Sequence, residues 1–412
     1  MLNSKNEREL AYVVTVDEIN ELPGYDRVES ARIGGWRCIV PKGQFHAGDP
    51  GIYFEIDSKV PADNPVFAFL EKRHYKIKTQ KMCKSLSQGL LIHAEDFGWQ
   101  IIRDGTNTPY IYDGEKVHYA DDETRFLTNI LNVTYADEED NARKAPSVDK
   151  YKRMAQRHPN IFKKSWARWL MKRKWGRKLM FIFFGKKKDK KNGWPEWVQK
   201  TDEERVQNMP WILEDEGEWI ITEKIDGSST TFTMKRGRRK NEFYVCSRNV
   251  CFDSIDKPCY YDTNIYWEMA QKYDMFNVLN ELLERMPKAD WVTIQGETYG
   301  VGVQKRDYNL TGHDFAAFNL ITSDKGRWNS NAMKNLLENG FNVPCVPVVE
   351  SSFSFNQLDQ LNGETRLDKI LTLAEGKSMI DGLPREGFVL RSVDGTKSFK
   401  AVSNSFLLKY HG

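Results

Sequence analysis

The stretch WIITEKIDGSSTTFTMKRG, at residues 219–237, holds the lysine on which the interpretation of this chain depends. An apolar run leads into EKIDG at 223–227, and the alternating residues that follow predict a strand at 230–235. Lys224 is therefore expected at the edge of a strand, between two carboxylates and shortly before a glycine. The pattern alone leaves two interpretations open: a salt-bridged turn, or a lysine that acts as a nucleophile.

The residues around this stretch predict a domain of mixed α and β structure. Further strands are expected where short apolar runs lie between turn signals, at 219–222, 242–246, 291–296, 315–321, 387–391 and 397–401. Helices are expected at 263–286 and 330–339, where apolar residues recur every three to four positions.

The N-terminal part of the chain has a different pattern. Residues 11–93 alternate short apolar runs with turn signals such as PGYD and HAGD, which is typical of an all-β module. About five strands are expected, enough for a small barrel. Residues 94–150 are polar and acidic, and they are expected to form a linker with some irregular or helical structure.

A strongly basic segment follows the predicted linker. Residues 152–191 contain sixteen Lys and Arg residues and a single acid, Asp189. The whole chain carries +3 and this segment +15, so the remaining residues carry −12. Three interpretations are open: a surface helix that touches RNA, a basic patch on a membrane surface, or a peripheral helix whose charges are only solvated. For the first of them, Lys172, Arg173 and Lys174 are candidate nucleic-acid contacts.

The composition indicates a soluble globular protein in the cytoplasm. The apolar fraction is 40% and the charged fraction 29%, and no apolar run approaches the ~20 residues that span a bilayer. The N-terminus MLNSKNEREL lacks the apolar core of a signal peptide. Cys246, Cys251 and Cys259 lie close in sequence, but their spacing favours reduced structural thiols over a metal site.

Several short motifs follow Lys224 in a fixed order. They are CSRN at 246–249, VTIQGETYG at 292–300, DFAAFNL at 314–320, REGFVLRS at 385–392 and KSFKAVS at 397–403. Each places one charged or aromatic residue in or beside a predicted strand. The tetrapeptide KIDG alone is a weak signal, and the ordered series carries much more information.

This series resembles the motifs of the covalent nucleotidyltransferase superfamily, which contains polynucleotide ligases and capping enzymes. With the β-rich N-terminus and KTDEERVQN at 200–208, the chain is similar to RNA ligases of the Deinococcus/Naegleria type, which carry an N-terminal OB-fold module. The resemblance covers about 1–95 and 195–412. It implies an α+β chain with three parts: an OB-like β-barrel at 1–120, a linker with the basic insertion at 121–195, and an ATP-grasp-like nucleotidyltransferase domain of antiparallel sheets and helices at 196–412.

The resemblance also implies a mechanism with ATP and Mg²⁺ or Mn²⁺. Lys224 would attack the α-phosphate of ATP, the AMP would pass to a 5′-phosphate of RNA, and a 3′-hydroxyl would displace it. Candidate catalytic residues are Lys224, Asp226, Glu297, Glu386 and Lys400, of which Asp226, Glu297 and Glu386 would hold the metal and its waters. Candidate nucleotide contacts are Glu223, Arg205 and Phe318 besides Lys224, Glu297 and Lys400, and Arg248 is a candidate nucleic-acid contact.

Some of these assignments have an ordinary structural alternative. Phe318 would stack on adenine or belong to the core of a strand, and Arg205 would contact phosphate or form a surface ion pair. Two positions depart from related enzymes. Ser229 stands where many DNA ligases have arginine, and Val402 stands where some RNA ligases have a second lysine, a role that Lys409 would then take.

Three other functions compete with RNA ligation. Capping guanylyltransferases and most DNA ligases share the KxDG motif, but they usually carry an OB-fold after the last motif, and only twelve residues follow Lys400 here. An OB-fold RNA-binding protein with a basic arm would explain the charge distribution but not the ordered motifs. The sequence therefore favours an RNA ligase, expected to be monomeric and to act on 3′-OH and 5′-phosphate ends, including those of a nicked duplex.

Overall fold

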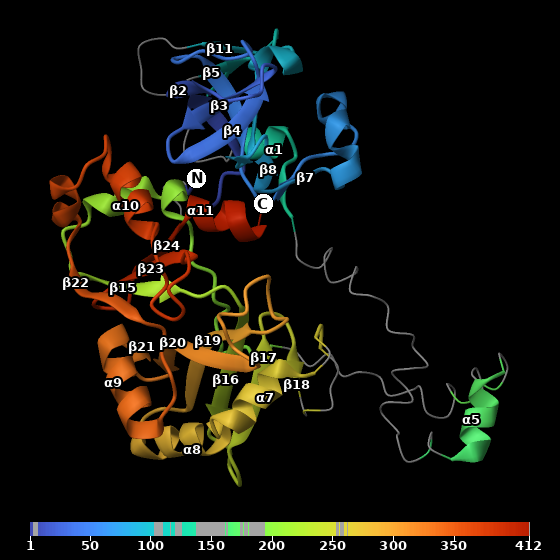
Figure 1. Cartoon of the computed structure of the whole chain (residues 1–412), viewed down its shortest axis with the longest axis vertical. Coiled ribbons are helices and arrows are strands. Elements are labelled where there is room, and N and C mark those ends of the chain that lie inside the picture. Colours follow the sequence, from blue (N-terminus) through green and yellow to red (C-terminus); the bar gives the residue numbers. More distant parts are fainter. Residues whose placement is uncertain are drawn as a thin grey trace. The chain divides into compact units, whose positions relative to one another are not determined.

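The computed structural model describes most of the chain as two compact units, each described here by itself (Figure 1). The described residues are 1–2, 7–102, 110–115, 117–119, 126–136, 161, 164–173, 176, 180, 194–252, 255, 259–261 and 263–411. Unit 1 comprises 1–137, 203–224 and 347–412, and unit 2 comprises 138–202 and 225–346. The chain thus passes from unit 1 to unit 2 directly after Lys224.

The N-terminal part of unit 1 is the predicted β-rich module. Its strands are β1 (Ala11–Thr15), β2 (Glu18–Glu21), β3 (Val28–Ile33), β4 (Trp36–Pro41), β5 (Pro50–Phe54), β6 (Ser58–Lys59), β7 (Lys76–Ile77), β8 (Gln80–Met82), β9 (Ser85–Ser87) and β10 (Leu90–Ile92). Their paired strands are antiparallel, and β4 buries Trp36, Cys38 and Val40 on alternate positions. This alternation is the period of two that predicts a half-buried strand.

The segment expected to be a linker belongs in part to this module. It contains η2 (Ala94–Phe97), β11 (Gln100–Ile102), β12 (Tyr110–Tyr112), β13 (Val117–Tyr119), α1 (Phe126–Ile130) and β14 (Thr134–Tyr135). Leu127 and Leu131 are buried against Ile52 and Phe54 of the barrel, and the Thr128 hydroxyl accepts hydrogen bonds from the first strand. The linker prediction is wrong for these residues, because their few apolar positions are too widely spaced to give a periodic signal.

The second part of unit 1 is a four-stranded antiparallel sheet in the order β22–β15–β23–β24. Its strands are β15 (Trp219–Lys224), β22 (Val348–Phe353), β23 (Gly387–Ser392) and β24 (Ser398–Val402). One face packs with α10 (Arg366–Ala374) and the short helices η3 (Val206–Asn208), η4 (Pro210–Glu214) and η5 (Phe355–Gln360). Buried aromatic rings dominate this core: Trp219 lies 5.1 Å from Phe355 and 5.4 Å from Phe399 between ring centroids.

The register of this sheet determines which side chains share a face. Lys224 pairs with Gly387, and Val389 pairs with Lys400. Because directly opposite residues of a sheet point to the same side, Lys224 and Lys400 lie on one face. The core residues Trp219 and Ile221 lie on the other face. The two lysines therefore lie on the face of the sheet opposite the core of Trp219 and Ile221, the face that also carries the buried Thr222.

The β-rich module and this sheet are packed together within unit 1. A β-carbon at Gly35 would lie 2.6 Å from Cγ of Gln207, so only glycine allows this approach. Arg32 forms an ion pair of 2.9 Å with Glu364, and Leu86 is buried against Val402. The last element, η6 (Leu407–His411), follows the short α11 (Asn404–Phe406) and contacts β8 and β9.

Unit 2 is built on a six-stranded antiparallel sheet covered by helices. The sheet order is β18–β17–β16–β19–β20–β21, with β16 (Ser228–Lys235), β17 (Glu242–Ser247), β18 (Cys251–Phe252), β19 (Trp291–Gly300), β20 (His313–Thr322) and β21 (Gly326–Arg327). Figure 1 shows α7 (Ile265–Lys272), α8 (Met275–Arg285) and α9 (Ser330–Phe341) against this sheet, and their buried side chains share one core with it. A further helix, α5 (Ser165–Met171), lies in the basic insertion.

The mixed α and β prediction is confirmed, with two differences. The helix expected at 263–286 is two helices, because Asp274 adopts a left-handed conformation (φ +47°) that ends the first one. The sequence analysis did not identify β22 and α10. The β22 sequence VVESSF has exposed polar residues, and α10 is a short helix whose Thr365–Asp368 capping box is its clearest signal.

Gly387 tests the packing of the sheet that carries Lys224. Its backbone is left-handed (φ +144°), and a β-carbon would lie 2.1 Å from the Ala401 carbonyl oxygen. We expect Gly387→Ala to lower the free energy of unfolding by clearly more than the about 1–2 kcal/mol of left-handed strain alone. Gly382→Ala is the matched control, since Gly382 also has positive φ but no atom within 4 Å. Urea unfolding of the two variants measures the difference, and equal losses would contradict the packing argument.

Candidate active site

Lys224 ends β15 at the position predicted from the sequence, and its ammonium group pairs with Glu386. Both carboxylate oxygens of Glu386 lie 3.0 Å from Nζ. The pairing follows from the register, because Glu386 immediately precedes Gly387, the partner of Lys224 across the sheet. The backbone carbonyl of Glu386 also accepts a hydrogen bond of 2.8 Å from the Ser403 amide. The pair is largely shielded, with 26% of the lysine side chain and 12% of the glutamate side chain exposed.

Lys400 and Arg205 lie in the same part of unit 1. The Lys400 amide donates to the Glu204 carbonyl at 2.8 Å, and Arg205 forms a parallel bridge with Lys400. The Arg205 guanidinium lies 5.8 Å from the ring centroid of Trp36, a residue of the β-rich module. Three cations and Glu386 are thus brought together by the sheet and the strand segment beside it.

Arg205 is buried rather than paired at the surface. Its Nη1 has no hydrogen-bond partner among the described residues. Burial lowers the pKa of Arg205, and the carboxylates of Asp57 and Glu386 act in the opposite direction. Because a buried, unsatisfied guanidinium nitrogen is costly, a phosphate oxygen is a suitable partner for this group.

Glu223 lies on the opposite face of β15 from Lys224 and is 2% exposed. Its Oε2 accepts a hydrogen bond of 2.7 Å from the Met379 amide, which attaches the 375–386 loop to the strand. Its Oε1 has no partner in the described part of the chain. Burial lowers the pKa of the neighbouring Arg385, and the Glu223 charge opposes that shift. The unsatisfied Oε1 can accept a hydrogen bond from a ligand.

In unit 2, the residues after Lys224 form a turn against β19. The Asp226 amide donates to the Tyr308 hydroxyl at 2.7 Å. A β-carbon at Gly227 would lie 2.8 Å from Cγ of Glu297 and 2.4 Å from the Thr298 carbonyl oxygen. The absence of a side chain at Gly227 thus allows the KIDG turn to approach β19 next to Glu297.

Phe318 lies on β20 and is half-buried, outside the main core of unit 2. The phenylalanines of that core include Phe232 and Phe315, whose rings lie 5.2 Å apart and edge to face. Arg248 lies in the turn after β17 and forms an ion pair of 2.8 Å with Asp202. This pair is half-exposed, so its net contribution to stability is small.

The candidate nucleic-acid contacts of the insertion are only partly described. Lys172 and Arg173 are exposed at the end of α5, and Lys174 lies outside the described residues. The Arg173 guanidinium lies 3.8 Å from the ring centroid of Trp169. Trp166 and Trp169 are about half-exposed, at 49% and 50%, which gives α5 an aromatic surface beside its cations.

The positions that depart from related enzymes have structural roles. The Ser229 hydroxyl lies 3.0 Å from the Thr201 hydroxyl. Val402 is buried with Leu86 and Leu407, so an apolar contact occupies the place of a second lysine. Lys409 is exposed, with Nζ 5.0 Å from the Tyr410 ring centroid. None of the six cysteines, all within the described part, forms a disulfide.

Two residues that hold the KIDG turn were not predicted from the sequence. Tyr308 is 2% exposed and its hydroxyl accepts from the Asp226 amide, and Gln304 donates to the Gly227 carbonyl at 2.9 Å. Both lie in the loop after β19. No sequence signal identifies them, because a lone tyrosine or glutamine in a polar loop is indistinguishable from a solvent-exposed one.

Comparisons with known proteins agree with this arrangement. Residues 217–411 match the RNA ligase family, and residues 10–94 match a family of OB-fold domains. The structure of the Naegleria gruberi RNA ligase with PPi is 27% identical, with a TM-score of 0.61, and the match covers 98% of this chain and 99% of that one. A mutant of the same enzyme with ATP and Mn is 26% identical, with a TM-score of 0.63, covering 98% and 100% of the two chains. A search of curated proteins found no match.

The fold and these matches define the chain as a polynucleotide ligase with an OB-fold module ahead of its ligase domain. More narrowly, the family match on the ligase domain and the similarity to the Naegleria enzyme over nearly the whole chain identify an RNA ligase. The α+β fold and the family resemblance inferred from the motif order are confirmed. No helix in the described ranges is long and apolar enough to cross a bilayer.

Proposed function

We propose that this enzyme joins RNA ends through a covalent adenylate on Lys224. It is an ATP-dependent RNA ligase, since it belongs to the RNA ligases and the similar Naegleria enzyme has been solved with ATP and Mn and with AMP and Mn. In the first step the lone pair of Nζ attacks the α-phosphorus of ATP. The bond to the β-phosphate breaks, pyrophosphate leaves, and a P–N bond forms.

Two further steps transfer the adenylate and seal the RNA. An oxygen of the RNA 5′-phosphate attacks the same phosphorus and displaces Lys224, which forms an RNA adenylate. The 3′-hydroxyl then attacks the 5′-phosphorus, and AMP leaves with the electrons of the broken anhydride bond. The observation that carries this proposal is the paired Lys224 and Glu386 at the strand end, with Lys400 on the same face of the sheet.

Lys224 must lose a proton before it can attack. Its unperturbed pKa of about 10.4 leaves the amine mostly protonated at neutral pH, and a carboxylate 3.0 Å away favours that charged form. The pair therefore holds a resting ammonium in position. Reorientation of Glu386 away from Nζ on nucleotide binding would remove the stabilisation of the ammonium and release the nucleophile.

The carboxylates fit a hydrated Mg²⁺ or Mn²⁺ ion. Asp226 and Glu297 belong to unit 2, Glu386 belongs to unit 1, and carboxylate oxygens are the ligands that these ions prefer. Among the described residues, no group of three His, Cys, Asp or Glu side chains is placed to hold a metal ion. We propose that these carboxylates hold the ordered waters of the ion. The bound ion would neutralise triphosphate charge and disfavour a protonated lysine.

The remaining residues of the site would bind the nucleotide. Lys400 and the buried Nη1 of Arg205 suit phosphate oxygens. The unsatisfied Oε1 of Glu223 suits an adenine amino group or a ribose hydroxyl. Phe318, outside the core, would stack on adenine, and Arg248 would exchange its exposed ion pair for a phosphate of the nucleic acid.

The test of this function is incubation with α-labelled ATP or GTP and a divalent ion, followed by a denaturing gel. Covalent label from ATP is expected. Label from GTP alone would indicate a capping enzyme, and no label from either would overturn the proposal. A panel of nicked and single-stranded RNA and DNA then distinguishes the preferred ends, for which we propose 3′-OH and 5′-phosphate RNA termini, including those of nicked duplexes.

Three further proposals come from the sequence. The functional boundaries are 1–120 for the OB-fold module, 121–195 for the connecting segment with its insertion, and 196–412 for the nucleotidyltransferase domain, although 126–136 of the connecting segment pack on the OB-fold module. The enzyme acts as a monomer. It works in the cytoplasm.

The basic insertion is expected to bind RNA without taking part in adenylylation. Residues 152–191 carry +15, and its helix α5 exposes Trp166 and Trp169 beside Arg173. Replacing 152–191 with a Gly/Ser linker should weaken RNA binding by about tenfold or more and flatten its salt dependence, because fewer counterions are released. Labelling from ATP should stay near that of the intact enzyme. Unchanged RNA affinity would contradict this role. So would binding of the intact enzyme to anionic vesicles that is lost when the insertion is replaced.

A further inference from the structure

A second concentration of positive charge lies in the OB-fold module. Residues 72–84 contain six cations and no acid: Lys72, Arg73, Lys76, Lys78, Lys81 and Lys84. We name these six residues the cationic ridge. The chain outside 152–191 carries −12 and the ridge carries +6, so all other residues together carry −18. The ridge is therefore a local exception on an acidic protein.

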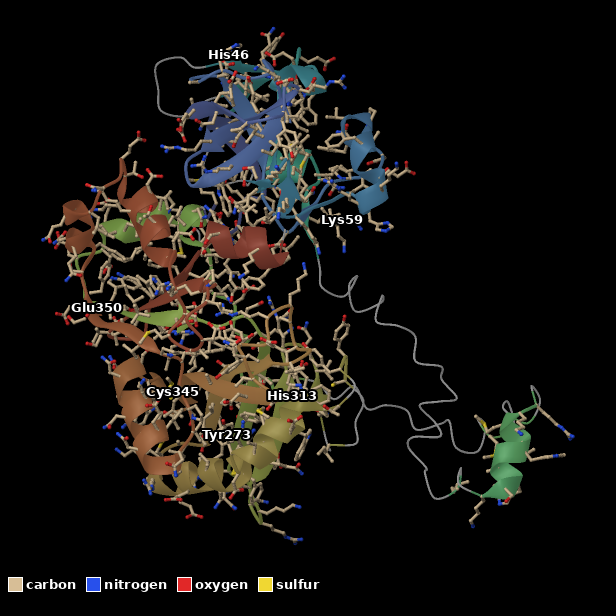
Figure 2. All side chains as sticks on the ribbon, viewed as in Figure 1. His46, Lys59, Tyr273, His313, Cys345 and Glu350 are labelled. Atoms are coloured by element: carbon tan, nitrogen blue, oxygen red, sulfur yellow. The ribbon has the colours of Figure 1, made fainter. Side chains whose placement is uncertain are left out.

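The ridge is formed by consecutive elements at one side of the module. The 3₁₀ helix η1 (Pro65–Arg73) ends with the first two cations, Lys76 lies in β7 and Lys78 directly after it, and the β8–β9 hairpin carries the last two. Ile77 is buried, so Lys76 and Lys78 point to the opposite side of the strand. Lys76 lies directly across from Lys59 on β6, and Figure 2 shows Lys59 beside the ribbon that Figure 1 labels β7.

Most of these cations have no protein partner among the described residues. Lys72, Arg73, Lys78 and Lys84 are exposed, and none of them forms an ion pair or a side-chain hydrogen bond within the described ranges. Lys81 differs, because its Nζ donates to the Leu408 carbonyl at 3.2 Å. Like charges held close together repel, and this repulsion is relieved by a polyanion.

The backbone of the ridge is also unusual. His74, Tyr75, Cys83 and Lys84 all have left-handed backbones, with φ of 53°, 59°, 53° and 60°. Residues with a β-carbon disfavour this conformation, and a two-residue hairpin turn is most relaxed with Asn-Gly. The β8–β9 turn instead keeps Lys84 at its tip, so the position of a cation is maintained at a cost in backbone strain.

The ridge is connected to the catalytic sheet within unit 1. Leu86 of β9 is buried against Val402, two residues after Lys400 on β24. Asp57, whose amide bonds to the Ile77 carbonyl of β7, acts electrostatically on Arg205. At the far end of the ridge, Phe69 on η1 is 62% exposed. A strand bound along the ridge would thus approach the part of unit 1 that holds Lys400 and Arg205.

We propose that the cationic ridge binds the phosphate backbone of the substrate RNA and that Phe69 stacks on an unpaired base. This inference rests on the RNA ligase function and adds a binding surface on the OB-fold module. The phosphates of a nucleic-acid backbone form ion pairs with a row of exposed cations such as the ridge. An exposed aromatic ring beside that row can stack on a base of single-stranded RNA.

The test neutralises the four exposed cations of the ridge in the full-length enzyme. The variant combines Lys72→Gln, Arg73→Gln, Lys78→Gln and Lys84→Gln. The matched control removes four exposed cations of unit 2, with the changes Arg238→Gln, Arg239→Gln, Lys240→Gln and Lys288→Gln. Binding of a fluorescent single-stranded RNA is measured by anisotropy over a range of KCl concentrations, and covalent labelling by ATP is measured in parallel.

We expect the ridge variant to bind RNA about tenfold or more weakly at low salt. Its salt slope should fall by about 0.7 for each RNA phosphate that the variant no longer neutralises, while the control keeps the slope of the wild type. Phe69→Ser alone should weaken binding of single-stranded but not of fully paired RNA. Labelling by ATP should be unchanged in all variants.

Other outcomes separate this inference from the proposed function. If the ridge variant bound RNA with the affinity and salt slope of the wild type, the ridge would not bind RNA. An acidic protein would then be the better candidate partner for its cations. Equal losses in the control would overturn it too, because net charge alone would then explain the effect. Absence of label in the wild type would instead contradict the proposed adenylylation. The anisotropy measurement would still test whether the ridge binds RNA. If the fourfold variant does not fold, the double variant Lys78→Gln with Lys84→Gln gives the same test. The expected change in the salt slope is then about half as large.

Discussion

Replacing Lys224 by alanine is expected to abolish covalent labelling of the enzyme by ATP. In the proposed mechanism the Lys224 amine is the nucleophile, and it lies at the end of β15 on the same face of the sheet as Lys400. Removal of a covalent nucleophile leaves no atom to form the P–N bond, so labelling should fall by at least about 10⁴-fold, to background. The measurement is a denaturing gel after incubation with labelled ATP and Mn²⁺.

A second lysine at a strand end is the matched control. Lys235 ends β16 as Lys224 ends β15, and its ammonium group lies 4.5 Å from the Trp197 ring centroid. Lys235→Ala should therefore be labelled normally. Because Lys224→Ala leaves the shielded carboxylate of Glu386 without its cation, the double variant Lys224→Ala with Glu386→Gln shows whether lost stability contributes. Persistent label in Lys224→Ala would mean that another residue is the nucleophile.

Replacing Glu297 by alanine is expected to reduce adenylylation by about 10²–10³-fold while thermal stability changes little. Losses of this size follow when one preorganised electrostatic contact to a reacting centre is removed. Glu297 is half-exposed on β19 beside Gly227, and it is absent from the apolar core. We therefore expect Glu297→Ala to affect the proposed metal site more than folding.

The metal dependence of this variant gives a second measurement. If Glu297 orders the water around a divalent ion, higher Mn²⁺ concentrations should restore part of the activity of Glu297→Ala. Glu281→Ala is the control, because Glu281 is an exposed carboxylate on α8 that pairs with Arg285 in the same helix. A Glu297→Ala protein that unfolds at a much lower temperature would show that the residue is structural, and the metal assignment would lose its support.

The sequence predicted those parts of the site that depend on local pattern. The apolar run before Lys224 predicted a strand at 219–222 with the lysine at its edge, and β15 extends from Trp219 to Lys224. REGFVLRS placed Glu386 at the start of a strand, and the antiparallel register then brings it to Lys224. Each motif lies within a few residues of a strand end, so a correct strand prediction also places its charged residue.

The parts that escaped prediction depend on contacts between distant residues. Tyr308 reaches Asp226 from a loop, and Arg205 is buried against Trp36 of another module. Neither contact changes the local period of apolar residues, which is the signal that sequence analysis uses. Residues 126–136 were missed for a related reason, since their burial is visible only when the barrel that covers them is known.

The discontinuity of unit 1 has a consequence for how the chain is synthesised. Its sheet joins β15 to β22, β23 and β24, which come after the whole of 225–346, whereas the sheet of unit 2 comes from one continuous stretch. During translation, unit 2 can fold as soon as it leaves the ribosome. The edges of β15 stay unpaired until β22, β23 and β24 have been synthesised. Lys224 meets Glu386 only after almost the entire chain has been made, so a nascent chain cannot yet form the Lys224–Glu386 pair.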